Sequence, residues 1–192
     1  VGEGKYEEAM DVITEKNPLP FITGTICAHA CMGKCTRNFY EDPVHIREMK
    51  KVAADNGYDA LIAKLSAPAV TKEGKAAVVG GGPAGMAAAY FLRRAGMAVT
   101  LFEKKSALGG VVRHVIPEFR IPGTSIDKDA ALLEKIGVEI RTNTEITSVE
   151  ALKGEGYTNV VLAVGAYKPG NVRLEAGEAV NALKFLEEFK AK

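Results

Sequence analysis

The first part of the chain places its hydrophobic residues at helical spacing. Apolar side chains recur every three or four residues across 5–16, at Tyr6, Ala9, Met10 and Ile13. This spacing predicts an amphipathic helix that ends at the segment NPLP, because proline lacks an amide hydrogen and restricts the residue before it. A second helix is predicted from Pro43, with Asp42 as its cap, to a stop at Gly57, and a short third helix follows over 58–65.

After a linker of small and turn-forming residues at 66–75, the hydrophobic pattern changes. Short segments rich in apolar residues predict strands over 76–80, 98–103, 138–142 and 159–166. Amphipathic segments predict helices over 83–96, 125–137 and 178–190. A strand, a helix and a strand within about 30 residues indicate parallel strands. We therefore expect an α/β protein with an all-helical domain over residues 1–70 and a Rossmann-like domain over residues 71–192.

Composition and charge narrow the class of protein. The 192 residues include 25 Lys and Arg against 24 Asp and Glu, so no basic surface is forced and nucleic acid is not an expected partner. No apolar run approaches the roughly 18–20 residues of a membrane span, so we expect no membrane partner either. Three clustered cysteines do not resemble a secreted disulfide framework, and they favour a cytoplasmic protein with a metal or redox role.

A glycine loop carries the strongest chemical signal. Gly80, Gly82 and Gly85 form the pattern GxGxxG between a predicted strand and a predicted helix, where a dinucleotide-binding fingerprint lies. The first glycine makes the tight turn, the second admits a pyrophosphate, and the third lets the helix pack on the strand. Glu103 ends the next strand, where its carboxylate can accept ribose hydroxyls. It disfavours NADP here, which leaves NAD or FAD, and the alternative is an ordinary glycine-rich turn.

The cysteines Cys27, Cys31 and Cys35 recur at every fourth position. If they were helical, each step would rise about 6 Å, and the outer two would lie about 12 Å apart on one face. One metal ion or a disulfide does not fit that spacing. Either the segment is irregular, or the third thiol serves a different site from the first two. Two alternatives are buried cysteines in the core and a zinc site that includes His29.

Four segments resemble one flavoprotein family. They are residues 7–38, which contain NPLP and the cysteines; 78–104, with the glycine loop; 108–122, LGGVVRHVIPEFRIP; and 159–166, NVVLAVGA. They are similar to the FAD and iron–sulfur family of the glutamate synthase small subunit, dihydropyrimidine dehydrogenase and selenate-reductase-type proteins. The resemblance implies a helical iron–sulfur domain followed by an incomplete FAD-binding Rossmann-like domain.

The resemblance also implies roles for individual residues. Glu103 would bind the adenosine ribose, Arg120 would contact the cofactor through its guanidinium group, and His114 could tune the flavin ring. The pyrophosphate would be held by Gly80, Gly82, Pro83 and Ala84, beside the packing glycine Gly85. Gly110 and Val111 would lie near the middle of FAD and Ile146 near the adenine. Ala163 and Gly165 would close the adenine side of the site.

For the cysteines, the resemblance implies [4Fe–4S] ligands drawn from two motifs. Thr23 stands where the first cysteine of the family's motif Cys-Gly-x-x-Cys would be. Three thiols do not complete a four-ligand cluster. We expect the chain to be a fragment, because a second glycine loop for NAD(P)H is missing.

The intact parent would be an oxidoreductase that passes electrons from NAD(P)H through FAD to iron–sulfur clusters and an electron-accepting subunit or domain. This chain alone would be inactive, and no residue in it is an evident acid or base catalyst. The alternative is a non-catalytic nucleotide-binding or assembly module.

Overall fold

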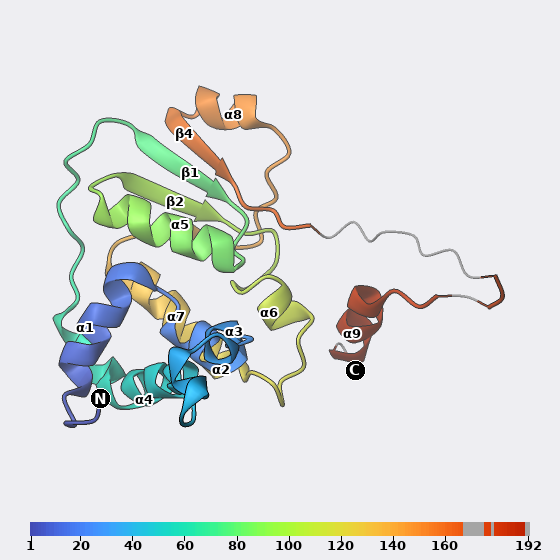
Figure 1. Ribbon diagram of the computed structural model, residues 1–192. Coiled ribbons are helices and arrows are strands. Elements are labelled where there is room, and N and C mark those ends of the chain that lie inside the picture. The colour runs from blue at the N-terminus through green and yellow to red at the C-terminus, as the bar shows by residue number, and fades with distance from the viewer. Residues whose placement is uncertain (167–174, 178, 191–192) are drawn as a thin grey trace.

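The computed structural model describes residues 1–166, 175–177 and 179–190 (Figure 1). Its first part is helical and lies against one side of a parallel sheet. The helical elements are α1 (Tyr6–Lys16), α2 (Pro20–Ile26), α3 (Ala30–Gly33), the 3₁₀ helix η1 (Thr36–Phe39) and α4 (Ile46–Lys64). Residues 65–74 have no regular structure and lead to the first strand.

The second part is an α/β unit, as the sequence predicts. Its strands are β1 (Lys75–Val79), β2 (Ala98–Phe102), β3 (Glu139–Arg141) and β4 (Tyr157–Leu162). All pairings are parallel and the order in the sheet is β3-β2-β1-β4. Val79 pairs with Phe102 on one side and with Leu162 on the other, so the carboxyl ends of the three strands meet at one edge. The helices are α5 (Pro83–Arg94), α6 (Val111–His114), α7 (Gly123–Lys135), α8 (Val149–Gly154) and α9 (Ala182–Lys190).

Alternate residues of the central strands fill two different cores. Ala76 and Val78 of β1 face the layer of α5 and α7, whereas Ala77 and Val79 face Leu152 of α8. Both faces of the strand are buried, which explains why the sequence of β1 is continuously apolar rather than alternating.

The helical part has its own core, but it shares α7 with the sheet. Met10, Phe21, Ala53, Ala54 and Leu61 pack together with Leu132 of α7. The next residue of α7, Leu133, belongs to the core under the sheet, which also receives Leu19 and Ile22 from the first part. In Figure 1, α7 accordingly runs between α5 and the first helices.

Several predicted boundaries of the helical part differ from the structure. The second helix begins at Ile46 rather than Pro43 and continues through Gly57 to Lys64. Gly57 does not stop the helix; it lets α4 approach α1, since a Cβ there would lie 2.5 Å from the carbonyl oxygen of Tyr6. NPLP ends α1 as expected, but Pro20 also opens α2, a helix that the sequence pattern did not indicate.

Further elements of the second part depart from the predicted pattern. Helix α6 was not predicted, and β4 covers Tyr157–Leu162 rather than 159–166. Helix α8 follows β3 and was not predicted. The last helix was expected over 178–190 and is observed as α9 from Ala182, while residue 178 lies outside the described residues. In the described ranges, no helix has the length and hydropathy needed to cross a membrane.

Candidate dinucleotide-binding site

The glycine loop turns sharply from β1 into α5. Gly80 has a positive φ of 107°, and a Cβ there would lie 2.4 Å from the carbonyl oxygen of Ala163. A Cβ on Gly85 would lie 1.8 Å from the carbonyl oxygen of Gly80. Both positions therefore require glycine for the fold itself, whether or not a ligand is bound.

Gly82 differs from these two glycines because its surroundings are open. It caps α5 with extended backbone, and a Cβ there would approach only the Cα of Gly110, at 3.8 Å. Pro83 follows at the first helical position, and the first-turn amide groups of a helix have no partner within it. These amides and the helix dipole attract a phosphate, and Gly82 leaves the space that a pyrophosphate needs.

Glu103 follows β2 and is only 7% exposed. Its Oε2 accepts a hydrogen bond from the amide of Gly81 at 2.8 Å, and its Oε1 accepts one from the amide of Lys105 at 2.8 Å. Each carboxylate oxygen has a further lone pair, so the side chain can fix the glycine loop and still accept ribose hydroxyls. The hydrogen bond that fixes the glycine loop was not predicted from the sequence, and the binding of a ribose stays a prediction.

A second glycine-containing turn closes the other side of the site. The amide of Gly109 donates to the carbonyl oxygen of Gly81 at 2.8 Å, which ties the two loops together. Gly110 has a φ of 54°, and a Cβ there would lie 2.8 Å from the Cα of Gly82. Arg113 secures this turn from α6 by donating to the carbonyl oxygen of Leu108. The two loops thus form one continuous wall.

These loops border a cavity of about 570 Å³ at the carboxyl edge of the sheet. Its volume and position are those expected of a cofactor site in an open parallel sheet. Most of the residues proposed from the sequence line it: Gly80, Gly82, Pro83, Ala84, Glu103, Gly110, Val111, Ile146, Ala163 and Gly165. Gly85 does not line the cavity. It allows α5 to pack closely against the backbone of Gly80, which does line it.

Arg120 is not brought to this cavity. It is exposed in the loop between α6 and α7 and is absent from the residues that line the hollow. Its backbone amide donates to the carbonyl oxygen of Pro117, which closes a local turn. The geometry therefore does not support the predicted contact between this guanidinium group and a cofactor.

Sequence reasoning also missed several polar residues that line the cavity, namely Lys104, Lys105, Thr144, Glu145 and Glu187. The two lysines could have been found, because they directly follow a strand whose carboxyl end faces the site. Glu187 could not, since it comes from α9 and its Oε1 accepts a hydrogen bond from the Nζ of Lys105. That lysine holds the pKa of Glu187 below its usual range.

His114 of α6 also lines the cavity. Its Nε2 lies 3.2 Å from the carbonyl oxygen of Ala107, so a neutral ring carries its proton on this nitrogen and donates it. Burial lowers the pKa of His114, which favours the neutral imidazole near pH 7. An effect of this ring on a flavin remains a prediction.

The cysteine segment is irregular, which was one of the two alternatives. Cys27 follows α2, Cys31 lies in α3, Cys35 precedes η1, and His29 has a left-handed φ of 44°. Cys27 and Cys31 are exposed and Cys35 is partly exposed, so the interpretation as core residues is wrong.

These thiols do not assemble a metal site by themselves. All three are free, and within the described part of the chain no three Cys, His, Asp or Glu side chains are grouped to hold a metal ion. This geometry also gives a zinc site with His29 no support. Amide groups of Val44 and Arg37 lower the pKa of the Cys35 thiol, which favours its thiolate form.

Two family models match the two parts of the chain. Residues 1–61 match the model described as dihydropyrimidine dehydrogenase domain II, 4Fe-4S cluster. Residues 78–140 match the model described as an NAD(P)-binding Rossmann-like domain.

Comparison with whole proteins extends the match across the chain. YgfK of Escherichia coli, named as an oxidoreductase, is 43% identical over 98% of this chain and 19% of its own length. The chain is a relative of this oxidoreductase and of the two described next. The small chain of glutamate synthase [NADPH] from Bacillus subtilis is 31% identical over 93% of this chain and 37% of its own. The beta subunit of NADPH-Fe(3+) oxidoreductase from Geobacter sulfurreducens is 34% identical over 88% of this chain and 26% of its own length.

The family resemblance inferred from the motifs is thereby confirmed. The chain spans only 19% to 37% of the length of these three relatives. Nearly the whole described fold therefore corresponds to one segment within much longer proteins.

Proposed function

We propose that this chain forms the FAD-binding site and the cysteine segment of a longer oxidoreductase. That protein would move electrons from NAD(P)H through FAD to iron–sulfur centres and an electron-accepting subunit or domain, in the cytoplasm. When bound, FAD supplies hydride and single-electron chemistry, while the protein supplies binding, orientation and electrostatics. The assignment of FAD rests on the family resemblance together with Glu103, which disfavours a 2′-phosphate.

The observation that carries the proposal is the preformed cavity at the carboxyl edge of the sheet. Its floor is the glycine loop, Gly82 leaves open space at the N-terminus of α5, and Glu103 offers acceptors at the end of β2. Val111 and Ile146 add apolar walls suited to the flat parts of a dinucleotide. In this chain, binding and orienting the cofactor is the work of these residues.

The proposed role of Cys27, Cys31 and Cys35 as iron–sulfur ligands rests on the match of residues 1–61. Their exposed positions do not complete a cluster site, so the remaining ligands would come from outside the described residues. We therefore assign no electron-transfer step to these thiols in the 192-residue chain.

The test uses a substitution that the fold tolerates and the ligand does not. Gly82→Ala adds a Cβ into open space, so the unfolding midpoint should stay within experimental error of the parent chain. The same Cβ occupies the place of the pyrophosphate, so FAD affinity should fall by about tenfold or more, which is about 1.4 kcal/mol. Gly33→Ala in α3, where a Cβ meets nothing within 4 Å, is the matched control.

FAD, NAD and NADP are titrated in parallel by flavin fluorescence and calorimetry. Tighter binding of NADP than of FAD would contradict the proposal, as would equal FAD affinity in Gly82→Ala and the parent chain. The rival function, a non-catalytic assembly module, is favoured if the longer protein has no flavin bands in its visible spectrum.

A further inference from the structure

Helix α2 begins without a capping group of its own. It starts at Pro20, which has no amide hydrogen, and the preceding Leu19 has no side-chain acceptor. The next amides, those of Phe21 and Ile22, therefore have no partner within the helix. Both residues are buried, at 1% and 3% exposure, so water cannot satisfy these two donors.

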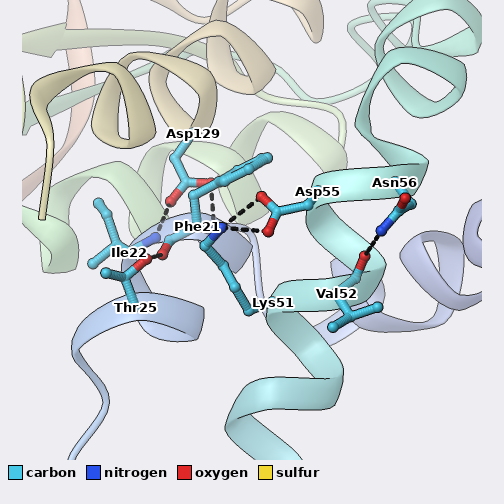
Figure 2. Close-up of polar contacts among 8 residues, drawn as sticks. All are labelled: Phe21, Ile22, Thr25, Lys51, Val52, Asp55, Asn56 and Asp129. Carbon is cyan, nitrogen blue, oxygen red and sulfur yellow. Dashed lines mark hydrogen bonds and ion pairs between the residues drawn. The ribbon is translucent and has the colours of Figure 1, made fainter.

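Asp129 satisfies both donors from another helix. Its Oδ1 accepts a hydrogen bond from the amide of Phe21 at 3.1 Å, and its Oδ2 accepts one from the amide of Ile22 at 2.8 Å. Figure 2 shows the carboxylate of α7 reaching across to the start of α2. The side chain is 0% exposed, and its partners lie more than 100 residues earlier in the chain.

The two helices joined in this way lead to the two sites. Cys27 directly follows α2 and is its C-terminal capping position, so the placement of α2 determines where the cysteine segment starts. At the beginning of α7, Ile126 lies beneath the turn at Gly109, where a Cβ would meet its Cγ2 at 3.0 Å. That turn is bonded to the glycine loop through Gly81. Asp129 therefore joins the helix that leads to Cys27 to the helix that packs beneath the turn at Gly109.

Several charged and titratable groups face this carboxylate. Lys50 of α4 is partly buried; burial lowers the pKa of its ammonium group, and the nearby carboxylate of Asp129 opposes this effect. Lys128 of α7 lies over the ring of Phe21 at 4.8 Å and over that of Tyr58 at 5.2 Å.

The remaining neighbours are more remote from the carboxylate. Lys51 of α4 lies 5.6 Å from the Phe21 ring centre and is paired with Asp55 on the same helix (Figure 2). Burial raises the pKa of Tyr58, with the charge of Asp129 adding to the effect.

We propose that Asp129 is a positioning residue, which holds the helix carrying Cys27 at a fixed distance from the dinucleotide cavity. The inference rests on the proposed function, because this distance matters only if electrons pass between the two sites. The carboxylate itself touches neither a cofactor nor a thiol; it acts through the amides of α2.

The experiment measures the distance directly in the 192-residue chain. Spin labels are attached to Cys27 and to a cysteine introduced by Lys104→Cys at the cavity rim, in a background of Cys31→Ser and Cys35→Ser. Pulsed electron paramagnetic resonance then gives the distance distribution, and amide hydrogen exchange reports on residues 20–26. Neither measurement requires FAD to bind.

Asp129→Ala removes both acceptors, so the distance distribution should broaden or shift and exchange in α2 should accelerate at least about tenfold. Asp129→Asn keeps one acceptor and should give an intermediate result. Asp55→Asn is the matched control: it removes an exposed carboxylate beside the same site and should change neither measurement. An effect on stability alone would lower the melting temperature and leave the distance in folded molecules unchanged.

An unchanged distance and unchanged exchange in folded Asp129→Ala would overturn the inference. If that variant does not fold, Asp129→Asn is judged by the same two measurements, and parental values would overturn it equally. Failure of the proposed function has a different signature, because the parent chain would then not bind FAD while both measurements still decide the role of Asp129.

Discussion

The dinucleotide cavity is built from backbone that admits few alternatives, whereas the cysteine segment consists of short, exposed elements. In the glycine loop that borders the cavity, Gly80 and Gly85 have no room for a Cβ. In the cysteine segment, Gly33 has nothing within 4 Å, and Cys27 and Cys31 are exposed. The described residues therefore give the cavity a defined wall, whereas they bring the three thiols into no common site.

The largest expected effect comes from filling the packed side of the cavity. Gly85→Ala would place a Cβ 1.8 Å from the carbonyl oxygen of Gly80, so either the strand or the helix must move. We expect a loss of about 3 kcal/mol or more in the free energy of unfolding. Urea denaturation measures it. Gly33→Ala should stay within about 0.5 kcal/mol, and equal losses in both variants would abolish the contrast between the two regions.

The next effect separates the two roles of Glu103. Glu103→Ala leaves the amides of Gly81 and Lys105 without acceptors, so stability should fall by about 2–3 kcal/mol. FAD affinity should fall by about 1–3 kcal/mol, because the ribose also loses its acceptor. Denaturation and FAD titration are run on the same preparation. A loss of affinity without a loss of stability would mean that the carboxylate does not hold the glycine loop.

The third prediction concerns pH and the junction between the two regions. Burial raises the pKa of Asp129 to about 7, against the opposing effects of the Ile22 and Phe21 amides and Lys50. The folded state therefore binds a proton more tightly than the unfolded state, and the contribution of this group to stability falls as pH rises from about 4 to about 7. Above that range its contribution is constant.

Denaturation at several pH values compares the parent chain with Asp129→Asn, which carries no titratable group at this position. The parent chain should lose stability across the window relative to the variant. Parallel pH profiles for the two proteins would show that Asp129 does not titrate there.

The smallest effect is expected in the cysteine segment. Replacing Cys27 and Cys31 together by serine should change the free energy of unfolding by no more than about 0.5 kcal/mol, because both side chains are exposed. FAD affinity should also be unchanged. A large loss of stability would reveal that the thiols do take part in packing, and would make the two regions more alike than their structures indicate.

The cavity was predictable from the sequence because its determinants are local. The glycine turn, the helix α5 that follows it and the acid after β2 lie within 25 residues of one another, and the backbone conformation selects glycine at fixed positions. Gly57 was misread since its role depends on the close approach of α1, and no local pattern contains that contact.

Asp129 and Glu187 were missed for a related reason. Each acts on a residue far away in the sequence: Asp129 on the start of α2, and Glu187 on Lys105. Within their own helices both look like ordinary polar residues. Arg120 is the reverse case, because its position in a family-like motif suggested a cofactor contact, whereas the structure places it in an exposed loop away from the residues that line the cavity.

The two adjacent leucines of α7 have a consequence for how the chain folds. Leu132 belongs to the core of the first helices and Leu133 to the core under the sheet, so a single turn of helix serves both. A chain cut near residue 70 would leave Leu132 facing water, and would leave Asp129 charged and without its two donors. We therefore expect the helical part and the sheet to unfold cooperatively, as one thermodynamic unit rather than as two independent modules.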